Sequence, residues 1–205
     1  WSSEAVFPHE LTKEEIAVLT AKYANAAIRV RYAGFDGVEI HSAHGYLLDQ
    51  FYSPLTNKRH DEYGCDSLEN RVRFHVEVIR AVRRAVGSDF PVALRLGACD
   101  YMEGGSTIAD GVAAAKIFEK EGVDLLDISG GMCGYIRPGH EEAGYFGDAA
   151  KAIKQAVSIP VMATGGVRTI EEANQLLADG TADLIGVGRP ILQDALWAKK
   201  AMQKA

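Results

Sequence analysis

Two imidazoles and a phenol follow one short apolar stretch of this sequence. Residues 37–42 contain β-branched side chains, are bounded by glycine and follow a helix-like segment, which predicts a buried parallel strand. His41, His44 and Tyr46 then lie at its carboxyl end. In barrels of alternating strands and helices, the loops at that end converge on one mouth, where the chemistry takes place. The grouping of these three side chains therefore favours a catalytic site.

The histidine pair could instead bind a metal ion or serve a structural role. Zinc sites normally combine such a pair with further Cys or His ligands at defined spacing, and the sequence shows none. A single histidine is usually a structural residue, but two of them beside a tyrosine favour a site. We expect no metal centre here.

Composition narrows the class of protein. A chain of 205 residues, 47% hydrophobic and 24% charged, is typical of one soluble globular domain, here taken as residues 1–205. The net charge of -6, with both signs interleaved, gives no electrostatic basis for binding nucleic acid. No stretch predicts a membrane span, and residues 1–8 do not have the pattern of a signal peptide. We expect no membrane association.

The cysteines point to a reducing compartment. Cys65, Cys99 and Cys133 are odd in number, far apart and without a CxxC pair. They indicate neither a disulfide framework nor an iron–sulfur site. We therefore expect a cytoplasmic protein.

Strands and helices are expected to alternate along the chain. Thr12 and Glu15 predict a capping box at the start of the first helix, which should end at Gly34. The stretch 50–66 is predicted to be a long loop. Further helices are predicted at about 67–86, 108–121, 147–157 and 170–178, with a last one around Trp197, and strands at 37–42, 91–97, 125–131, 161–166 and 184–189.

This order predicts an α/β fold with a parallel sheet and right-handed crossovers. The strands are nearly continuous apolar runs, as in a sheet covered on both faces. Periodicity alone does not separate an open doubly wound sheet from part of an eight-stranded barrel. Glycines at the strand ends favour the TIM-barrel type.

The last two predicted strands end in residues suited to phosphate. Gly165-Gly166 and Gly188-Arg189 stand where barrels commonly bind phosphate through loop amides and a helix N-terminus. Glycine lets the backbone approach phosphate oxygens, and Arg189 can add charge-assisted hydrogen bonds. The alternative is that the glycines only end the strands tightly and Arg189 pairs with a surface carboxylate.

The run EIHSAHGYLLDQFYSPLTNKRHDEYG, from Glu39 to Gly64, resembles the old yellow enzyme family of FMN-dependent NAD(P)H oxidoreductases and ene-reductases. The likeness extends from about Leu11 to Trp197. It implies that His41 and His44 bind the carbonyl or phenolate oxygen of a ligand stacked on the flavin, and that Tyr46 donates a proton.

The resemblance also implies the cofactor and the reaction. Arg95 matches the arginine at the pyrimidine edge of the flavin, although a structural salt bridge is the alternative. The phosphate contacts fall on Gly165, Gly166, Gly188 and Arg189, and Gly130 and Gly131 fall near the flavin pocket. FMN, reduced by NADH or NADPH, would transfer hydride to the activated C=C bond of an enone or enoate, and Tyr46 would complete the reduction with a proton.

The strand count departs from the family. Its barrel has eight strands, and this sequence supplies those that resemble the fourth to the eighth. Five parallel strands cannot close a barrel, and their two edges would be exposed. We therefore expect an incomplete barrel, a fragment that pairs with itself or with a missing N-terminal segment.

Two other functions stay open at this point. One is a different phosphate-binding barrel without flavin, such as an isomerase or an aldolase, although no Schiff-base lysine stands at a strand end. The other is a catalytically silent half-barrel, an assembly module that retains a phosphate site.

Overall fold

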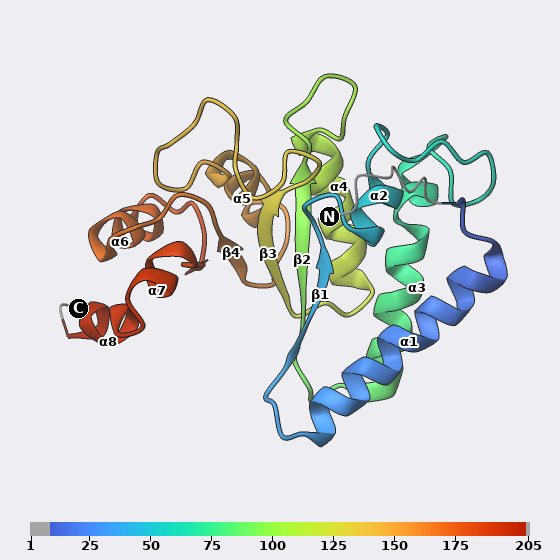
Figure 1. Cartoon of the computed structure of the whole chain (residues 1–205), viewed down its shortest axis with the longest axis horizontal. Helices are drawn as coiled ribbons and strands as arrows, with labels where there is room; N and C mark the ends of the chain where they lie inside the picture. The colour runs from blue at the N-terminus through green and yellow to red at the C-terminus, as the bar shows by residue number, and fades with distance from the viewer. Residues whose placement is uncertain (1–8, 204–205) are drawn as a thin grey trace, which may run out of the picture.

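The computed structural model describes residues 9–203, and its centre is one parallel sheet (Figure 1). Neighbours in the sheet are neighbours in the sequence, and every adjacent pair is parallel. The strands are β1 (Val38–Ser42), β2 (Val92–Cys99), β3 (Leu125–Gly130), β4 (Val161–Ala163) and β5 (Leu184–Ile185). The parallel α/β fold predicted from the sequence is confirmed.

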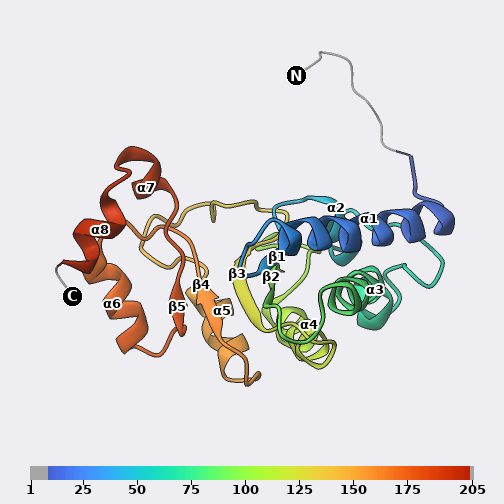
Figure 2. The same ribbon diagram turned by 90° about the horizontal axis from the view of Figure 1, so that it is seen from below.

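Helices cover one face of this sheet. Between the strands, α3, α4, α5 and α6 follow one another along the outer side of the curved strands, and α1 packs against α3 (Figure 2). The helices are α1 (Lys13–Tyr32), α2 (Leu47–Tyr52), α3 (Leu68–Val86), α4 (Ile108–Lys120), α5 (Gly147–Lys154), α6 (Ile170–Ala178), α7 (Arg189–Gln193) and α8 (Trp197–Met202). Within the described chain, none of them has the length and apolar character needed to cross a membrane.

The two faces of the sheet differ in burial. Side chains that point toward the helices, such as Ile40, Leu94 and Ile128, are buried in the core. Alternate positions on the same strands, such as His41 and Arg95, are only partly buried. This second face is the one that a closed barrel would enclose, because side chains alternate between the two faces of a strand.

The sheet does not close. Among residues 9–203, β1 pairs only with β2, and β5 pairs only with β4. The described chain is therefore an incomplete barrel with two open edges, as the strand count predicts.

Side-chain caps fix where α1, α3, α4 and α6 begin. Thr12 and Glu15 form the predicted capping box, and Ser67 caps α3 through the backbone N–H of Asn70. Helix α1 ends with Ala33 as its cap, one residue before the predicted Gly34, which follows in a left-handed conformation with φ 85°. Local capping chemistry thus sets most boundaries of the outer layer.

Several predicted boundaries were wrong. The predicted loop 50–66 overlaps α2, which forms because Leu48, Phe51 and Tyr52 follow helical spacing and are buried together. The residues described form eight helices, not six, since α2 and α7 were not expected. Strands β4 and β5 are also shorter than predicted, because their glycines leave the ladder early.

Candidate active site

The predicted catalytic side chains lie together at the end of β1. The ring of His41 is 5.2 Å from that of His44 and 5.2 Å from that of Tyr46, centroid to centroid. The turn between them places His44 at φ 60° and Gly45 at φ 74°, and Tyr46 caps α2 with its side chain 62% exposed. The chain therefore presents two imidazoles and one accessible phenol on one side of the sheet.

His44 is held by contacts to β3. Its Nε2 is 2.8 Å from the hydroxyl oxygen of Ser129, and its backbone N–H donates to the carbonyl of Gly130 at 3.2 Å. Burial, with smaller effects of Arg95 and His41, lowers the pKa of His44 to about 4. Burial and then Arg95 also lower the pKa of His41. Both imidazoles are therefore neutral at neutral pH, and each keeps one N–H to donate.

Two buried carboxylates, which the sequence analysis missed, anchor this turn. Asp49 is 0% exposed and accepts a hydrogen bond from the backbone N–H of Gly45 at 2.7 Å. Asp100 accepts from the Ser53 hydroxyl at 2.6 Å and from the Met132 N–H at 2.7 Å. Burial raises the pKa of Asp49 to about 8, a net value in which the Gly45 hydrogen bond lowers the pKa and the Asp100 charge adds a smaller increase. For Asp49, the sequence did offer a signal, because a charged residue stands there among the apolar residues of the stretch 47–52.

Arg95 lies on the inner face between an imidazole and a carboxylate. In the strand register it stands opposite His41 on β1 and Asp127 on β3. Its Nε is 3.4 Å from Oδ2 of Asp127. The structural salt bridge, which the sequence analysis gave as the alternative to a flavin contact, is therefore present. Burial raises the pKa of Asp127 to about 7, while Arg95 lowers it and Glu39 raises it.

This ion pair leaves polar atoms unsatisfied. Nε of Arg95 and Oδ1 of Asp127 are buried and have no hydrogen-bond partner within residues 9–203. Buried polar groups in proteins are almost always hydrogen-bonded. The inner face therefore offers a donor and an acceptor to a polar ligand.

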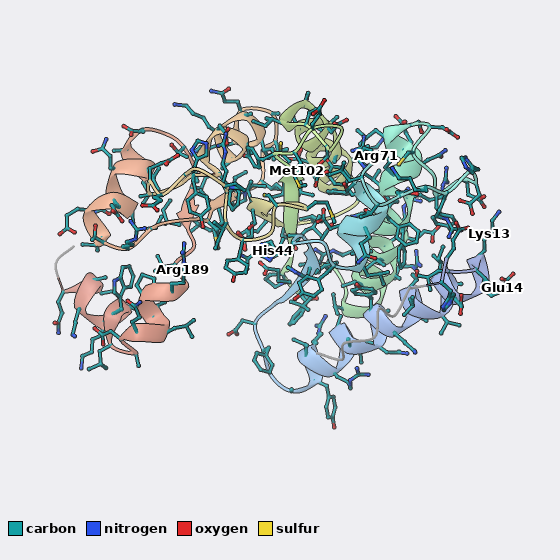
Figure 3. The ribbon with its side chains drawn as sticks, turned by 45° about the horizontal axis from the view of Figure 1, so that its top comes forward. Lys13, Glu14, His44, Arg71, Met102 and Arg189 are labelled. Carbon is teal, nitrogen blue, oxygen red and sulfur yellow. The ribbon has the colours of Figure 1, made fainter. Side chains whose placement is uncertain are left out.

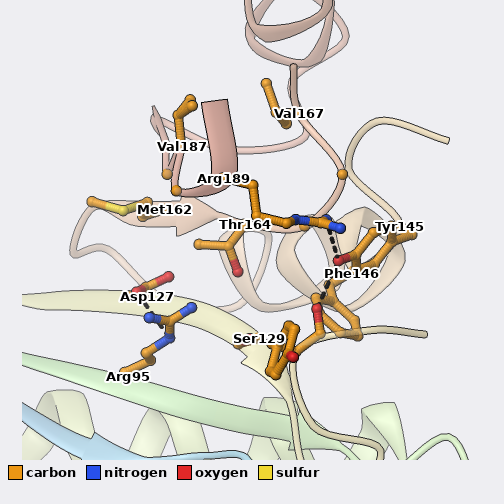
Figure 4. Close-up of a pocket in the computed structure, with 15 residues that line it drawn as sticks. Arg95, Asp127, Ser129, Tyr145, Phe146, Met162, Thr164, Val167, Val187 and Arg189 are labelled. Carbon is orange, nitrogen blue, oxygen red and sulfur yellow. Dashed lines mark hydrogen bonds and ion pairs between the residues drawn. The ribbon is translucent and has the colours of Figure 1, made fainter. Parts of the chain in front are cut away.

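A cavity of about 240 Å³ opens beside this pair, at the ends of β3, β4 and β5 (Figure 4). It brings together five of the predicted cofactor residues, namely Arg95, Gly165, Gly166, Gly188 and Arg189. Arg95 and Arg189 lie at different sides of this cavity (Figure 4). Figure 3 shows His44 beside the central strands and Arg189 at the start of α7.

The glycines after β4 are required by their surroundings. Gly165 has φ 104° and Gly166 has φ 71°. A Cβ at Gly165 would lie 2.6 Å from the ring of Tyr145, and one at Gly166 would lie 2.4 Å from the carbonyl oxygen of Glu142. Only glycine fits this turn, which lines the cavity with backbone.

Gly130 and Gly131 do not line the cavity. A Cβ at Gly131 would lie 2.3 Å from Oδ1 of Asp100, and one at Gly130 would lie 2.3 Å from the carbonyl oxygen of Gly134. Both glycines allow close packing against neighbouring segments. The carbonyl of Gly130 also accepts a hydrogen bond from the backbone N–H of His44.

The arrangement defines a class of protein: a parallel barrel-type α/β fold with a cation on its inner face and a glycine-rich, arginine-containing turn at its last strands. Within residues 9–203, no group of three or more His, Cys, Asp or Glu side chains is placed to hold a metal ion.

The chain belongs to the NADH:flavin oxidoreductase / NADH oxidase family, whose sequence model matches residues 1–205. The resemblance predicted from the sequence is confirmed. The family's flavin is FMN, and its relatives are named for NADH or NADPH, as expected.

Three comparisons illustrate the likeness. The chain is 43% identical over 200 residues to an NADH oxidase of Thermoanaerobacter brockii, covering 96% of this chain and 31% of the relative. It is 41% identical over 199 residues to an NADPH dehydrogenase of Bacillus licheniformis, covering 96% and 57%. The solved structure of a 2-naphthoyl-CoA reductase in complex with 2-naphthoyl-CoA superposes with a TM-score of 0.88 and 32% identity, covering 96% and 30%. The chain thus spans about a third to just over half of these proteins.

Proposed function

We propose that this chain provides the FMN site and the proton donor of an NAD(P)H-dependent oxidoreductase that reduces C=C bonds conjugated to a carbonyl, such as those of enones and enoates. The observation that carries the proposal is the shared open face. On it, the His41, His44 and Tyr46 cluster adjoins the cavity that contains Arg189, because Nε2 of His44 is 2.8 Å from the hydroxyl of Ser129, which lines that cavity.

The residues present fit FMN. Arg95 has a buried Nε without a hydrogen-bond partner among the described residues, which suits the polar edge of a flavin ring. At the other side, Gly165 and Gly166 bring backbone to the cavity wall, and Gly188 and Arg189 complete it. We assign the phosphate to these four residues.

Bound FMN would supply hydride exchange with NADH or NADPH and with the substrate. Neutral His41 has one N–H to donate to the carbonyl oxygen of the substrate, and His44 offers its own at Nδ1 when Nε2 accepts from the Ser129 hydroxyl. Both donors would stabilise the negative charge that develops on that oxygen. Tyr46 is exposed and adjacent to His41, so its phenol can protonate the carbon next to the carbonyl.

The substrate class is supported by these donors and by a relative. A carbonyl oxygen needs hydrogen-bond donors, and the cluster offers two imidazoles and a phenol with no carboxylate among them. The 2-naphthoyl-CoA of the structural relative is itself a thioester conjugated to an unsaturated ring.

The test is Tyr46→Phe in the FMN-loaded chain. With 2-cyclohexenone as substrate, we expect its reduction to fall by about 10²-fold or more, because a positioned general acid contributes that much. Flavin reduction by NADH or NADPH, followed anaerobically, should not change. Full alkene reduction by the variant would remove Tyr46 from this role.

The open sheet edges favour a second candidate. The edges of β1 and β5 have no partner strand in the described chain, and the chain covers only part of its relatives. We propose as the alternative a catalytically silent half-barrel that keeps a phosphate site and needs a further segment, or a second copy, for activity. FMN binding without alkene reduction would support it, and a stable monomer in light scattering would count against self-pairing.

We also propose a reducing, cytoplasmic location, on the ground that Cys65, Cys99 and Cys133 are free thiols.

A further inference from the structure

Tyr145 contacts both the glycine turn and Arg189 at the proposed phosphate side of the cavity. We propose that Tyr145 is a positioning residue that fixes the guanidinium of Arg189 for the phosphate of FMN and so makes the site prefer FMN to riboflavin. This inference rests on the proposed function. Tyr145 was not singled out by the sequence.

The hydroxyl of Tyr145 has a defined hydrogen-bond direction. It donates to the backbone carbonyl of Tyr135 at 2.7 Å and accepts from Nη2 of Arg189 at 3.0 Å (Figure 4). A phenol has one proton, and the Tyr135 carbonyl uses it. The hydroxyl oxygen is therefore left as an acceptor for Arg189.

The rest of Tyr145 is immobilised by packing. The residue is 4% exposed, and its ring covers the turn of Gly165 and Gly166 so closely that a Cβ at either glycine would lie within 3 Å of the ring. Its backbone carbonyl accepts from Nη1 of Arg137 at 2.8 Å. The hydroxyl is thus held at a fixed point, and a phenylalanine could keep the same packing without it.

The charge of Arg189 is left available. No carboxylate of residues 9–203 forms an ion pair with it, unlike Arg95, which pairs with Asp127. A neutral phenol orients the guanidinium without cancelling its charge. An arginine side chain loses much rotamer freedom when it binds an anion, and an existing hydrogen bond reduces that loss.

The experiment compares FMN and riboflavin, which differ by the phosphate, as ligands of the 205-residue chain. Their dissociation constants are measured by titration of flavin fluorescence for the wild type and for Tyr145→Phe. We expect Tyr145→Phe to weaken FMN binding about 10-fold, the scale of one hydrogen bond to a charged group, and to leave riboflavin binding unchanged.

Tyr63→Phe is the matched control. Tyr63 is also buried, at 7% exposed, and its hydroxyl donates to a carboxylate oxygen of Glu77 at 2.9 Å, outside the cavity. Neither dissociation constant should change in this variant.

A double-mutant cycle keeps the test informative if Tyr145→Phe also lowers stability. In an Arg189→Gln background, which should itself lose the preference for FMN, Tyr145→Phe is expected to have no further effect on FMN binding. Equal weakening of FMN and riboflavin, no change in either, or additive effects in the cycle would overturn the inference while the proposed function stood. A wild-type chain that binds neither flavin would overturn both.

Discussion

The imidazole of His44 and the hydroxyl of Ser129 are joined by a 2.8 Å contact between ring nitrogen and hydroxyl oxygen. This contact ties the turn after β1 to the end of β3 and holds one proposed substrate-binding group in place.

His44 is expected to titrate far below an ordinary histidine. Its pKa of about 4 follows mainly from burial, which disfavours the charged ring. Nitrogen NMR of labelled imidazoles should show neutral His44 at pH 5.5. A protonated ring at pH 5.5 would contradict the account of a neutral donor.

Because of Asp49, the free energy of unfolding should decrease as the pH rises from about 4 to about 8. Its folded-state pKa is raised to about 8, so the native state binds more protons than the unfolded state in that window. One such proton gives a slope of at most about 1.4 kcal/mol per pH unit. Asp49→Asn, whose amide oxygen can still accept from Gly45, should flatten the dependence in urea titrations at several pH values.

Asp36→Asn serves as the exposed control for this prediction. It should leave the pH dependence of the free energy of unfolding unchanged. An unchanged slope in Asp49→Asn would show that Asp49 is already ionised in the native state.

Gly166→Ala should be more costly than Gly180→Ala. Both glycines have positive φ, 71° and 67°, but a Cβ at Gly166 meets the Glu142 carbonyl at 2.4 Å while one at Gly180 meets nothing within 4 Å. Backbone strain alone costs about 1–2 kcal/mol, which is the expected effect at Gly180. Gly166→Ala should exceed it and also weaken FMN binding; equal losses in urea unfolding would contradict the close packing.

Arg95→Met should weaken FMN and riboflavin together, by about 10-fold, because Arg95 is assigned to the ring and not to the phosphate. The test is to measure the dissociation constants of FMN and riboflavin for this variant, by the same fluorescence titration as for Tyr145→Phe. Removing the Arg95 charge should also raise the pKa of Asp127 further, since Arg95 is the group that lowers it. A loss confined to FMN would place Arg95 at the phosphate instead.

Local sequence signals predicted much of the fold. The Thr12 and Glu15 capping box, the strand before His41 and the parallel order of five strands all follow from short-range patterns, and all are present. Helix α2 was missed because its six residues are too few for a helical period to stand out in the sequence. The glycines that follow β4, Gly165 and Gly166, pack against Tyr145, a contact that no local pattern encodes.

Only the part of the site that lies within one short stretch of sequence was predicted. His41, His44 and Tyr46 are close in the sequence, so one strand end brings them together. Tyr145 acts through a hydrogen bond to Arg189, 44 residues further along the chain, and its side-chain type alone does not signal such a contact.

Retention of FMN is the most direct test of the central claim. The purified 205-residue chain is mixed with excess FMN and desalted, and its visible absorption spectrum is recorded beside that of Arg189→Gln treated in the same way. We predict a flavin band at about one FMN per chain in the wild type and a much weaker band in the variant. A colourless wild-type chain, with no FMN binding in a direct titration, would contradict the account.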